Sequence, residues 1–77
     1  DLSAEEHALF ERLRAWRAAT AQAHGVPAYV ILHDSTLLEL LRARPHSLEA
    51  MRHVSGIGAR KLENFGAALL DLLEAGA

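Results

Sequence analysis

The residues best suited to chemistry lie in a glycine turn followed by two basic residues. The turn reads Val54-Ser55-Gly56-Ile57-Gly58, and Arg60 and Lys61 fall in the first turn of the helix expected after it. Glycine can adopt positive φ or let another backbone approach closely. The first amides of a helix lack intrahelical acceptors, and the helix dipole makes that end positive. The pattern therefore suits a phosphate, held by backbone amides and basic side chains.

The same turn also has a purely structural interpretation. Gly-x-Gly sequences between helices occur wherever two helices pack closely, and Gly56 and Gly58 would then serve sterics alone. In both interpretations the apolar side chains of Val54 and Ile57 point into the core. The turn by itself therefore predicts an anchored corner, and only suggests an anion site.

Other groups of reactive residues carry little chemistry. His33, Asp34 and Ser35 are the residue types of a hydrolytic triad, but consecutive side chains at a helix start point apart, so helix capping is the better interpretation. No histidine pair has i,i+4 spacing or a His-Glu-x-x-His context, so we predict neither a metal site nor a cofactor. The five histidines are His7, His24, His33, His46 and His53.

Length and composition limit the class of protein. The chain has 77 residues, eight basic and ten acidic side chains, a formal charge of −2 and no cysteine. One domain of this size leaves no room for an enzyme cleft beside a core, so we expect no catalysis. No apolar run approaches the roughly 20 residues of a membrane span. The chain begins at Asp1, and we expect one domain over 1–77, cut from a longer cytoplasmic protein, nucleoid-associated if bacterial.

The first element that must support the turn is a long helix. Ser3 and Glu6 form a capping-box pattern, and no glycine or proline follows until Gly25 and Pro27, so we predict a helix from about Ala4 to His24. A helix of this length spans roughly 30 Å and can form the back wall of the domain. Its predicted core-facing stripe contains Leu9, Leu13, Trp16, Thr20 and Ala23, with Phe10 beside them.

The remaining elements are shorter. Residues 29–32 are apolar and permit a strand, but an unpaired strand is improbable, so we predict a helical turn that plugs the core with Tyr29 near the surface. Asp34 or Ser35 should cap the next helix and Ser47 a short one, and Gly66 should break the last segment into two helices. The predicted fold is all-α: a compact bundle of five to six helices with a helix-hairpin-helix-like Gly-x-Gly turn.

With these segments in order, the chain resembles the HRDC family, the helicase and RNase D C-terminal domain. The resemblance extends from about Glu6 to Leu73 and follows the family's order of motifs. The matching segments are Leu13-Arg14-Ala15-Trp16-Arg17, Gly25-Val26-Pro27-Ala28-Tyr29-Val30-Ile31, Asp34-Ser35-Thr36-Leu37, Arg44-Pro45 with Ser47-Leu48, and Gly56-Ile57-Gly58-Ala59-Arg60-Lys61-Leu62-Glu63 with Phe65-Gly66.

The resemblance implies a non-catalytic helical domain that contacts DNA or other protein domains. The family's DNA-contact positions correspond to Tyr29, whose ring offers a face to a base. They also correspond to Arg60 and Lys61, beside the backbone amides of the glycine turn at Gly56 and Gly58. Two further basic residues, Arg44 and Arg17, would extend the patch. If Tyr29 has a purely structural role instead, its ring should be half-buried. The corresponding structural role of Arg17 is to cover the core with the aliphatic part of its side chain. Asn64 stands where many members carry a basic residue.

Two functions follow from these observations. The family resemblance favours an accessory domain of a RecQ-type DNA helicase that binds single-stranded or branched DNA weakly and without sequence preference. The slightly acidic charge favours a regulatory module that docks on the helicase core or on other domains of the same chain. A ribonuclease D parent is a third setting. In each case we expect a monomer in isolation, because the leucines from Leu69 to Leu73 fit a core better than a dimer seam.

Overall fold

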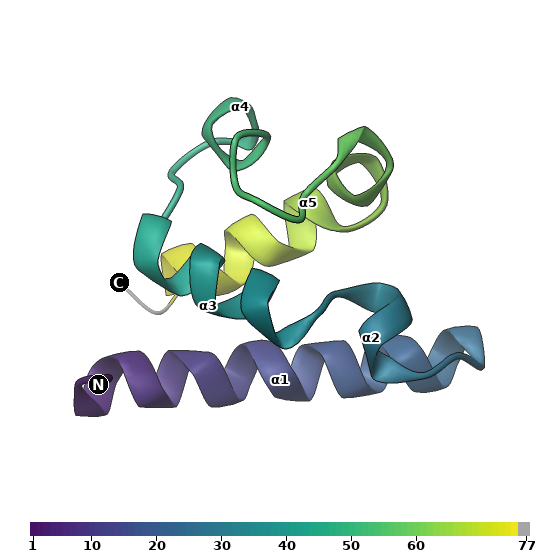
Figure 1. Cartoon of the computed structure of the whole chain (residues 1–77), viewed down its shortest axis with the longest axis horizontal. Helices are drawn as coiled ribbons and strands as arrows, with labels where there is room; N and C mark the ends of the chain where they lie inside the picture. The colour runs from purple at the N-terminus through teal and green to yellow at the C-terminus, as the bar shows by residue number, and fades with distance from the viewer. Residues whose placement is uncertain (76–77) are drawn as a thin grey trace.

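The computed structural model describes residues 1–75, and these form five helices and no strand. Figure 1 shows α1 along one side of the molecule and α5 running back in the opposite direction, so that the start of α1 and the end of α5 lie at the same end. The helices are α1 (Ala4–His24), α2 (Ala28–Ile31), α3 (Asp34–Ala43), α4 (Leu48–Met51) and α5 (Ala59–Ala75). The predicted all-α bundle is confirmed.

Helix α1 begins and ends where the sequence predicts. The Ser3 hydroxyl accepts a hydrogen bond from the Glu6 amide at 3.1 Å, and the Glu6 carboxylate accepts one from the Ser3 amide at 2.9 Å. The hydrogen bond that the Ser3 amide donates to this carboxylate lowers the pKa of Glu6 below its ordinary value. At the other end Gly25 adopts the left-handed conformation, with φ 66°. The molecule is 32 Å long, so α1 spans its whole length.

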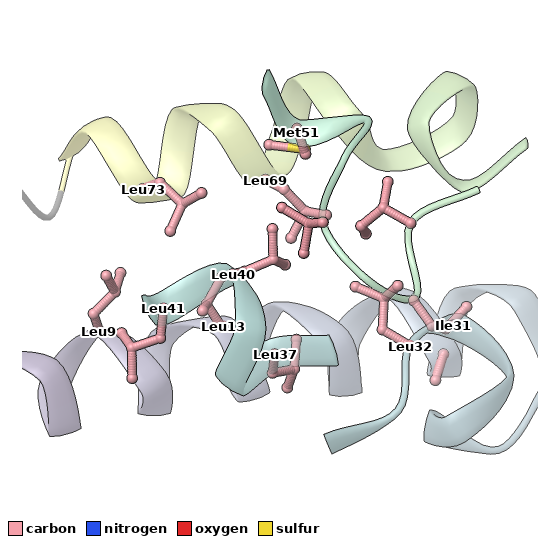
Figure 2. Packing of buried hydrophobic residues seen from close by; sticks show 13 residues of the cluster. Leu9, Leu13, Ile31, Leu32, Leu37, Leu40, Leu41, Met51, Leu69 and Leu73 are labelled. Atoms are coloured by element: carbon pink, nitrogen blue, oxygen red, sulfur yellow. The ribbon is translucent and has the colours of Figure 1, made fainter. Parts of the chain in front are cut away.

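The hydrophobic core lies between α1 and α5, with α3 crossing between them (Figure 2). Figure 2 shows Leu9 and Leu13 of α1 facing Leu69 and Leu73 of α5, with side chains of α3 filling the space between. The buried stripe of α1 differs in part from the prediction. After Leu13 it continues through Arg17 and Ala21, whereas Trp16 and Thr20 are only partly buried and Ala23 is exposed.

The segment around α2 plugs one end of this core, as predicted. Ile31 and Leu32 are buried, whereas Tyr29 is 62% exposed. The expected cap of α3 was wrong. His33 occupies the N-cap position without a side-chain cap bond, and Asp34 is the first helical residue, with its carboxylate paired to Arg17. Ser47 caps α4 as predicted, accepting from the Ala50 amide at 3.0 Å.

The predicted helix break at Gly66 was also wrong, because α5 runs through this residue without interruption. A glycine inside a helix costs only about 1 kcal/mol. Here its missing side chain lets α4 approach α5, since a Cβ at Gly66 would lie 3.0 Å from side-chain carbons of both Leu48 and Leu62. Phe65 continues the packing on α5, with its ring 5.5 Å from that of Trp16 in an edge-to-face arrangement.

None of the helices described over residues 1–75 combines the length and apolar character that a membrane crossing requires.

Candidate nucleic-acid interface

The glycine turn is fixed from beneath by its two apolar side chains. Val54 and Ile57 are both buried, as predicted, and the Ile57 amide donates to the Val54 carbonyl at 3.0 Å. Gly56 adopts a φ of 94°, and a Cβ there would lie 2.1 Å from Oγ1 of the buried Thr36. The turn thus packs against α3, and sterics alone require glycine at position 56.

Gly58 differs from Gly56 in both respects. Its φ is not positive, and a Cβ built on it would meet no atom within 4 Å. It directly precedes α5, and its carbonyl accepts the first helical bond, from Leu62 at 2.9 Å. The amides in the first turn of α5 come before Leu62 in the chain, so they have no acceptor within the helix. The surface at Gly58 is therefore open, as an approaching phosphate would require.

Lys61 connects this end of α5 to α2. Its Nζ donates to the carbonyl oxygens of Val30 and Ile31, at 2.6 and 2.7 Å. These carbonyls end a four-residue helix that is too short to hold itself together. An ammonium group has three donors, so one remains for another acceptor. The side chain predicted as a phosphate contact is therefore occupied mainly in holding α2 in place.

Replacing Lys61 with methionine should lower the stability of the domain by about 1–2 kcal/mol, because two carbonyls lose a charged donor. The same change should speed hydrogen exchange at the Leu32 amide, which bonds to Ala28 and closes α2. Thermal melts and hydrogen exchange measure the two effects. Arg60→Met is the control, since it removes a neighbouring charge that makes no hydrogen bond or ion pair within residues 1–75. Equal stability of the two variants would contradict this role of Lys61.

Tyr29 lies on the outer side of the segment that Lys61 holds. Its ring stacks on the imidazole of His33, with centroids 6.1 Å apart and planes 27° apart. It remains 62% exposed, so the half-buried alternative was wrong. Next to it, Val30 is 44% exposed. This short helix therefore presents an aromatic ring and an aliphatic side chain together to solvent.

A cleft of about 280 Å³ lies between α2, the end of α1 and the start of α5. Arg60 stands in its lining, is exposed, and forms no ion pair within the described part of the chain. No carboxylate of residues 1–75 contributes to the lining. The eight lining residues are His24, Val26, Val30, Ile31, Arg60, Lys61, Asn64 and Phe65.

The two other basic candidates lie elsewhere. Arg44 adopts a left-handed conformation at the end of α3, and its Nη2 donates to the Leu73 carbonyl at 3.4 Å. Leu73 is thirteen residues beyond Arg60 on α5, or roughly 20 Å along the helix. Arg17 is buried and bonds the Leu32 carbonyl at 2.9 Å. The structure thus brings Arg60 and Lys61, in the turn of α5 that follows Gly58, together with the α2 segment. Arg44 and Arg17 lie outside this surface.

Four cleft residues escaped the sequence analysis. His24, Val26, Val30 and Phe65 come from three separate segments. Val26, Val30 and Phe65 stand in segments that carry the family resemblance, but the sequence indicated no binding role for any of the four. The sequence placed His24 only at the end of a helix, and Val30 only in the helical turn that packs into the core. The one available signal was the apolar Val30 beside Tyr29 in a segment already expected to reach the surface.

Comparison with known proteins identifies the family of the chain. A family model described as the HRDC domain matches residues 6–73. The ATP-dependent DNA helicase UvrD2 of Mycobacterium bovis is 42% identical over 65 residues, which cover 84% of this chain and 9% of that protein. The ATP-dependent DNA helicase RecQ of Haemophilus influenzae is 36% identical over 66 residues, covering 86% of this chain and 11% of that protein.

A solved structure gives the same result for the fold. RecQ HRDC domain 3 of D. radiodurans superposes with a TM-score of 0.87 at 28% identity, over 91% of this chain and 92% of that one. The chain therefore matches nearly all of that solved domain, whereas it spans only about a tenth of the length of the two helicases.

Proposed function

The chain belongs to the HRDC family, whose members are non-catalytic accessory domains of helicases such as RecQ and UvrD2, and on that premise we propose that it helps a DNA helicase engage single-stranded or branched DNA. The contact is weak and independent of sequence. It uses one surface, made of Tyr29 on α2, Arg60 on α5 and the free amides that follow Gly58. This surface is called the α2/α5 surface below.

The observation that carries the proposal is the exposed Tyr29 ring on a short helix that Lys61 fixes beside Arg60. A base stacks on an exposed aromatic ring whatever its identity, because every base has a π-face. An arginine that has no partner within residues 1–75 and the positive end of a helix attract the adjacent phosphates. Stacking and phosphate contact on one surface are the two parts of sequence-independent binding to a single strand.

The charge balance of the chain sets the expected strength. Arg60, the third donor of Lys61 and the α5 amides can neutralise two or three phosphates. The logarithm of the affinity should then fall against the logarithm of salt concentration with a shallow slope of about −2, and the dissociation constant should lie near 10⁻⁴ M, at the weak end of nonspecific binding. A net charge of −2 contributes no long-range attraction to DNA.

Replacing Arg60 with glutamine should weaken binding to a single-stranded oligonucleotide and flatten the salt slope by about 0.7, since one phosphate contact is lost. Fluorescence anisotropy with a labelled oligonucleotide at low and higher salt measures both quantities. Arg12→Gln is the matched control. It removes the same charge from an exposed residue of α1 that lies twelve residues before His24, or roughly 18 Å along the helix.

The outcome for Arg12→Gln decides between a local and a general charge effect. Equal weakening by the two variants would mean that overall charge governs binding, and the α2/α5 surface would lose its assignment. Absence of saturable binding by the parent domain at low salt would contradict the proposed function as a whole.

A second function has its own support in the surface composition. The chain carries ten acidic and eight basic side chains, and Val30 and Leu48 expose apolar area that a protein partner can cover. We propose as the alternative that the domain docks on the helicase core and regulates its access to DNA. Deleting the domain from the full-length protein should then tighten DNA binding, whereas weaker binding after deletion would favour the accessory DNA-binding function.

A further inference from the structure

We propose that the cleft beside α2 accepts one unpaired nucleobase of the bound strand, while Arg60 holds the phosphate of the same nucleotide. This inference rests on the proposed DNA-binding function and identifies its ligand as a single nucleotide unit. It adds a second base position to the exposed ring of Tyr29, which does not line the cleft.

The cleft has the lining that a base requires. Aliphatic side chains of Val26, Val30 and Ile31 and the ring of Phe65 make most of it apolar. The Phe65 ring is held in place, because Trp16 and His24 both lie edge-to-face with it, at 5.5 and 6.2 Å between centroids. A rigid apolar cleft binds a flat aromatic ligand at little ordering cost.

The polar residues stand where a base and its phosphate would need them. The Asn64 side chain offers both donors and an acceptor, so it can pair with the edge of more than one base. Lys61 has committed two of its donors to the α2 carbonyls, which leaves Arg60 as the principal cation for a phosphate. The guanidinium fork suits phosphate oxygens, with two parallel hydrogen bonds.

Charge complementarity favours a nucleotide over a peptide in this cleft. Acidic side chains outnumber basic ones in the chain as a whole, yet none of the eight lining residues is acidic, and two are cationic. The positive charge of the cleft thus contrasts with the negative net charge of the molecule, and this favours an anionic ligand. A base in a duplex cannot turn its edge into the cleft without leaving the stack, so the cleft should favour single strands over duplex.

The test uses thymidine 5′-monophosphate as a probe, because it is small enough to enter the cleft without reaching Tyr29 as a strand would. Methyl NMR spectra of the intact domain report on Val26, Val30 and Ile31. We expect saturable shifts of these methyl signals with the nucleotide and smaller ones with thymidine. Inorganic phosphate alone should shift only signals near Arg60. Arg60→Gln should weaken binding of the nucleotide about tenfold, which is the effect of losing one charged hydrogen bond.

Two substitutions at the exposed Asn64 give effects of opposite sign without altering the core. Asn64→Asp places a carboxylate in the lining and should abolish the methyl shifts, whereas Asn64→Lys adds a cation and should tighten nucleotide binding. Arg12→Gln, which lowers the net charge as much as Asn64→Asp does, should leave the shifts unchanged. Equal loss with Asn64→Asp and Arg12→Gln would overturn the inference.

Two further results would also overturn it, and they leave the proposed function standing. One is an oligonucleotide that binds the domain while the mononucleotide moves none of the cleft methyl signals at millimolar concentration. The other is a set of methyl shifts that inorganic phosphate reproduces in full, since the base would then lie outside the cleft. If no oligonucleotide binds at all, the proposed function itself fails.

Discussion

Replacing Gly56 with alanine should lower the free energy of unfolding by about 3 kcal/mol, the largest effect that we expect from one added methyl group in this chain. Two costs combine. A φ of 94° strains any residue with a Cβ, by about 1–2 kcal/mol. The new Cβ would also lie 2.1 Å from Thr36 Oγ1, and overpacking of a buried site costs about 1–3 kcal/mol more. In a domain of this size, 3 kcal/mol lowers Tm by roughly 15–20 °C.

Thermal and urea unfolding of three variants separate these costs. Gly58→Ala is the control, because position 58 has neither positive φ nor an atom near its Cβ, and it should cost no more than about 1 kcal/mol. Combining Thr36→Ala with Gly56→Ala should restore the stability lost to overpacking, and the two substitutions should then show a favourable coupling free energy of about 1–2 kcal/mol. If Gly56→Ala proves as stable as Gly58→Ala, or if the double variant recovers nothing, the contact between the turn and α3 is not what requires glycine.

Replacing Arg17 with methionine should cost about 2–3 kcal/mol. Methionine keeps an apolar stem under α2 but leaves the Leu32 carbonyl without the donor that now lies 2.9 Å away in the interior. An unpaired buried carbonyl costs about 1–3 kcal/mol. The ion pair of Arg17 with Asp34, at 2.7 Å, adds little, because the Asp34 side chain is 75% exposed. The expected fall in Tm is roughly 10–20 °C.

Asp34→Asn separates the two interactions of Arg17. It removes the ion pair and leaves the carbonyl bond, so chemical denaturation should show a loss below about 1 kcal/mol. Arg17→Lys retains the charge, but a single ammonium cannot reproduce the fork, and its stability should fall between those of the parent and Arg17→Met. Equal losses for Asp34→Asn and Arg17→Met would place the stabilisation in the ion pair instead. Neither variant should alter DNA contact directly, since Arg17 lies outside the α2/α5 surface.

The helix boundaries were predictable where a few neighbouring residues determine the backbone conformation. Ser3 and Glu6 satisfy each other's amides, and Gly25 with Pro27 ends the helix, so the bounds of α1 follow from local hydrogen bonding alone. The same holds for Ser47 at α4. Tyr29 and Arg60 are both exposed, as a surface contact would require, and their role as contacts stays a prediction.

The errors arise where a distant contact overrides a local preference. Gly66 disfavours a helix by itself, but Leu48 packs where its side chain would be, and α5 continues. His33 rather than Asp34 occupies the N-cap position of α3, and the Asp34 carboxylate pairs with Arg17, seventeen residues away. The roles of Gly56 and Gly58 could not be separated in the sequence, since the positive φ of Gly56 and its contact with Thr36 of α3 are set by the fold.

The sequence alone determined that this chain is a helical HRDC domain and where most of its helices begin, because caps, glycines and apolar spacing act within a few residues. Only the tertiary structure decided what each basic residue does. Lys61 reaches carbonyls thirty and thirty-one residues away, Arg17 bonds the Leu32 carbonyl, and Arg44 holds the far end of α5. A charged side chain is committed or free according to the acceptors that folding places beside it, and for these three residues every acceptor comes from a distant part of the chain.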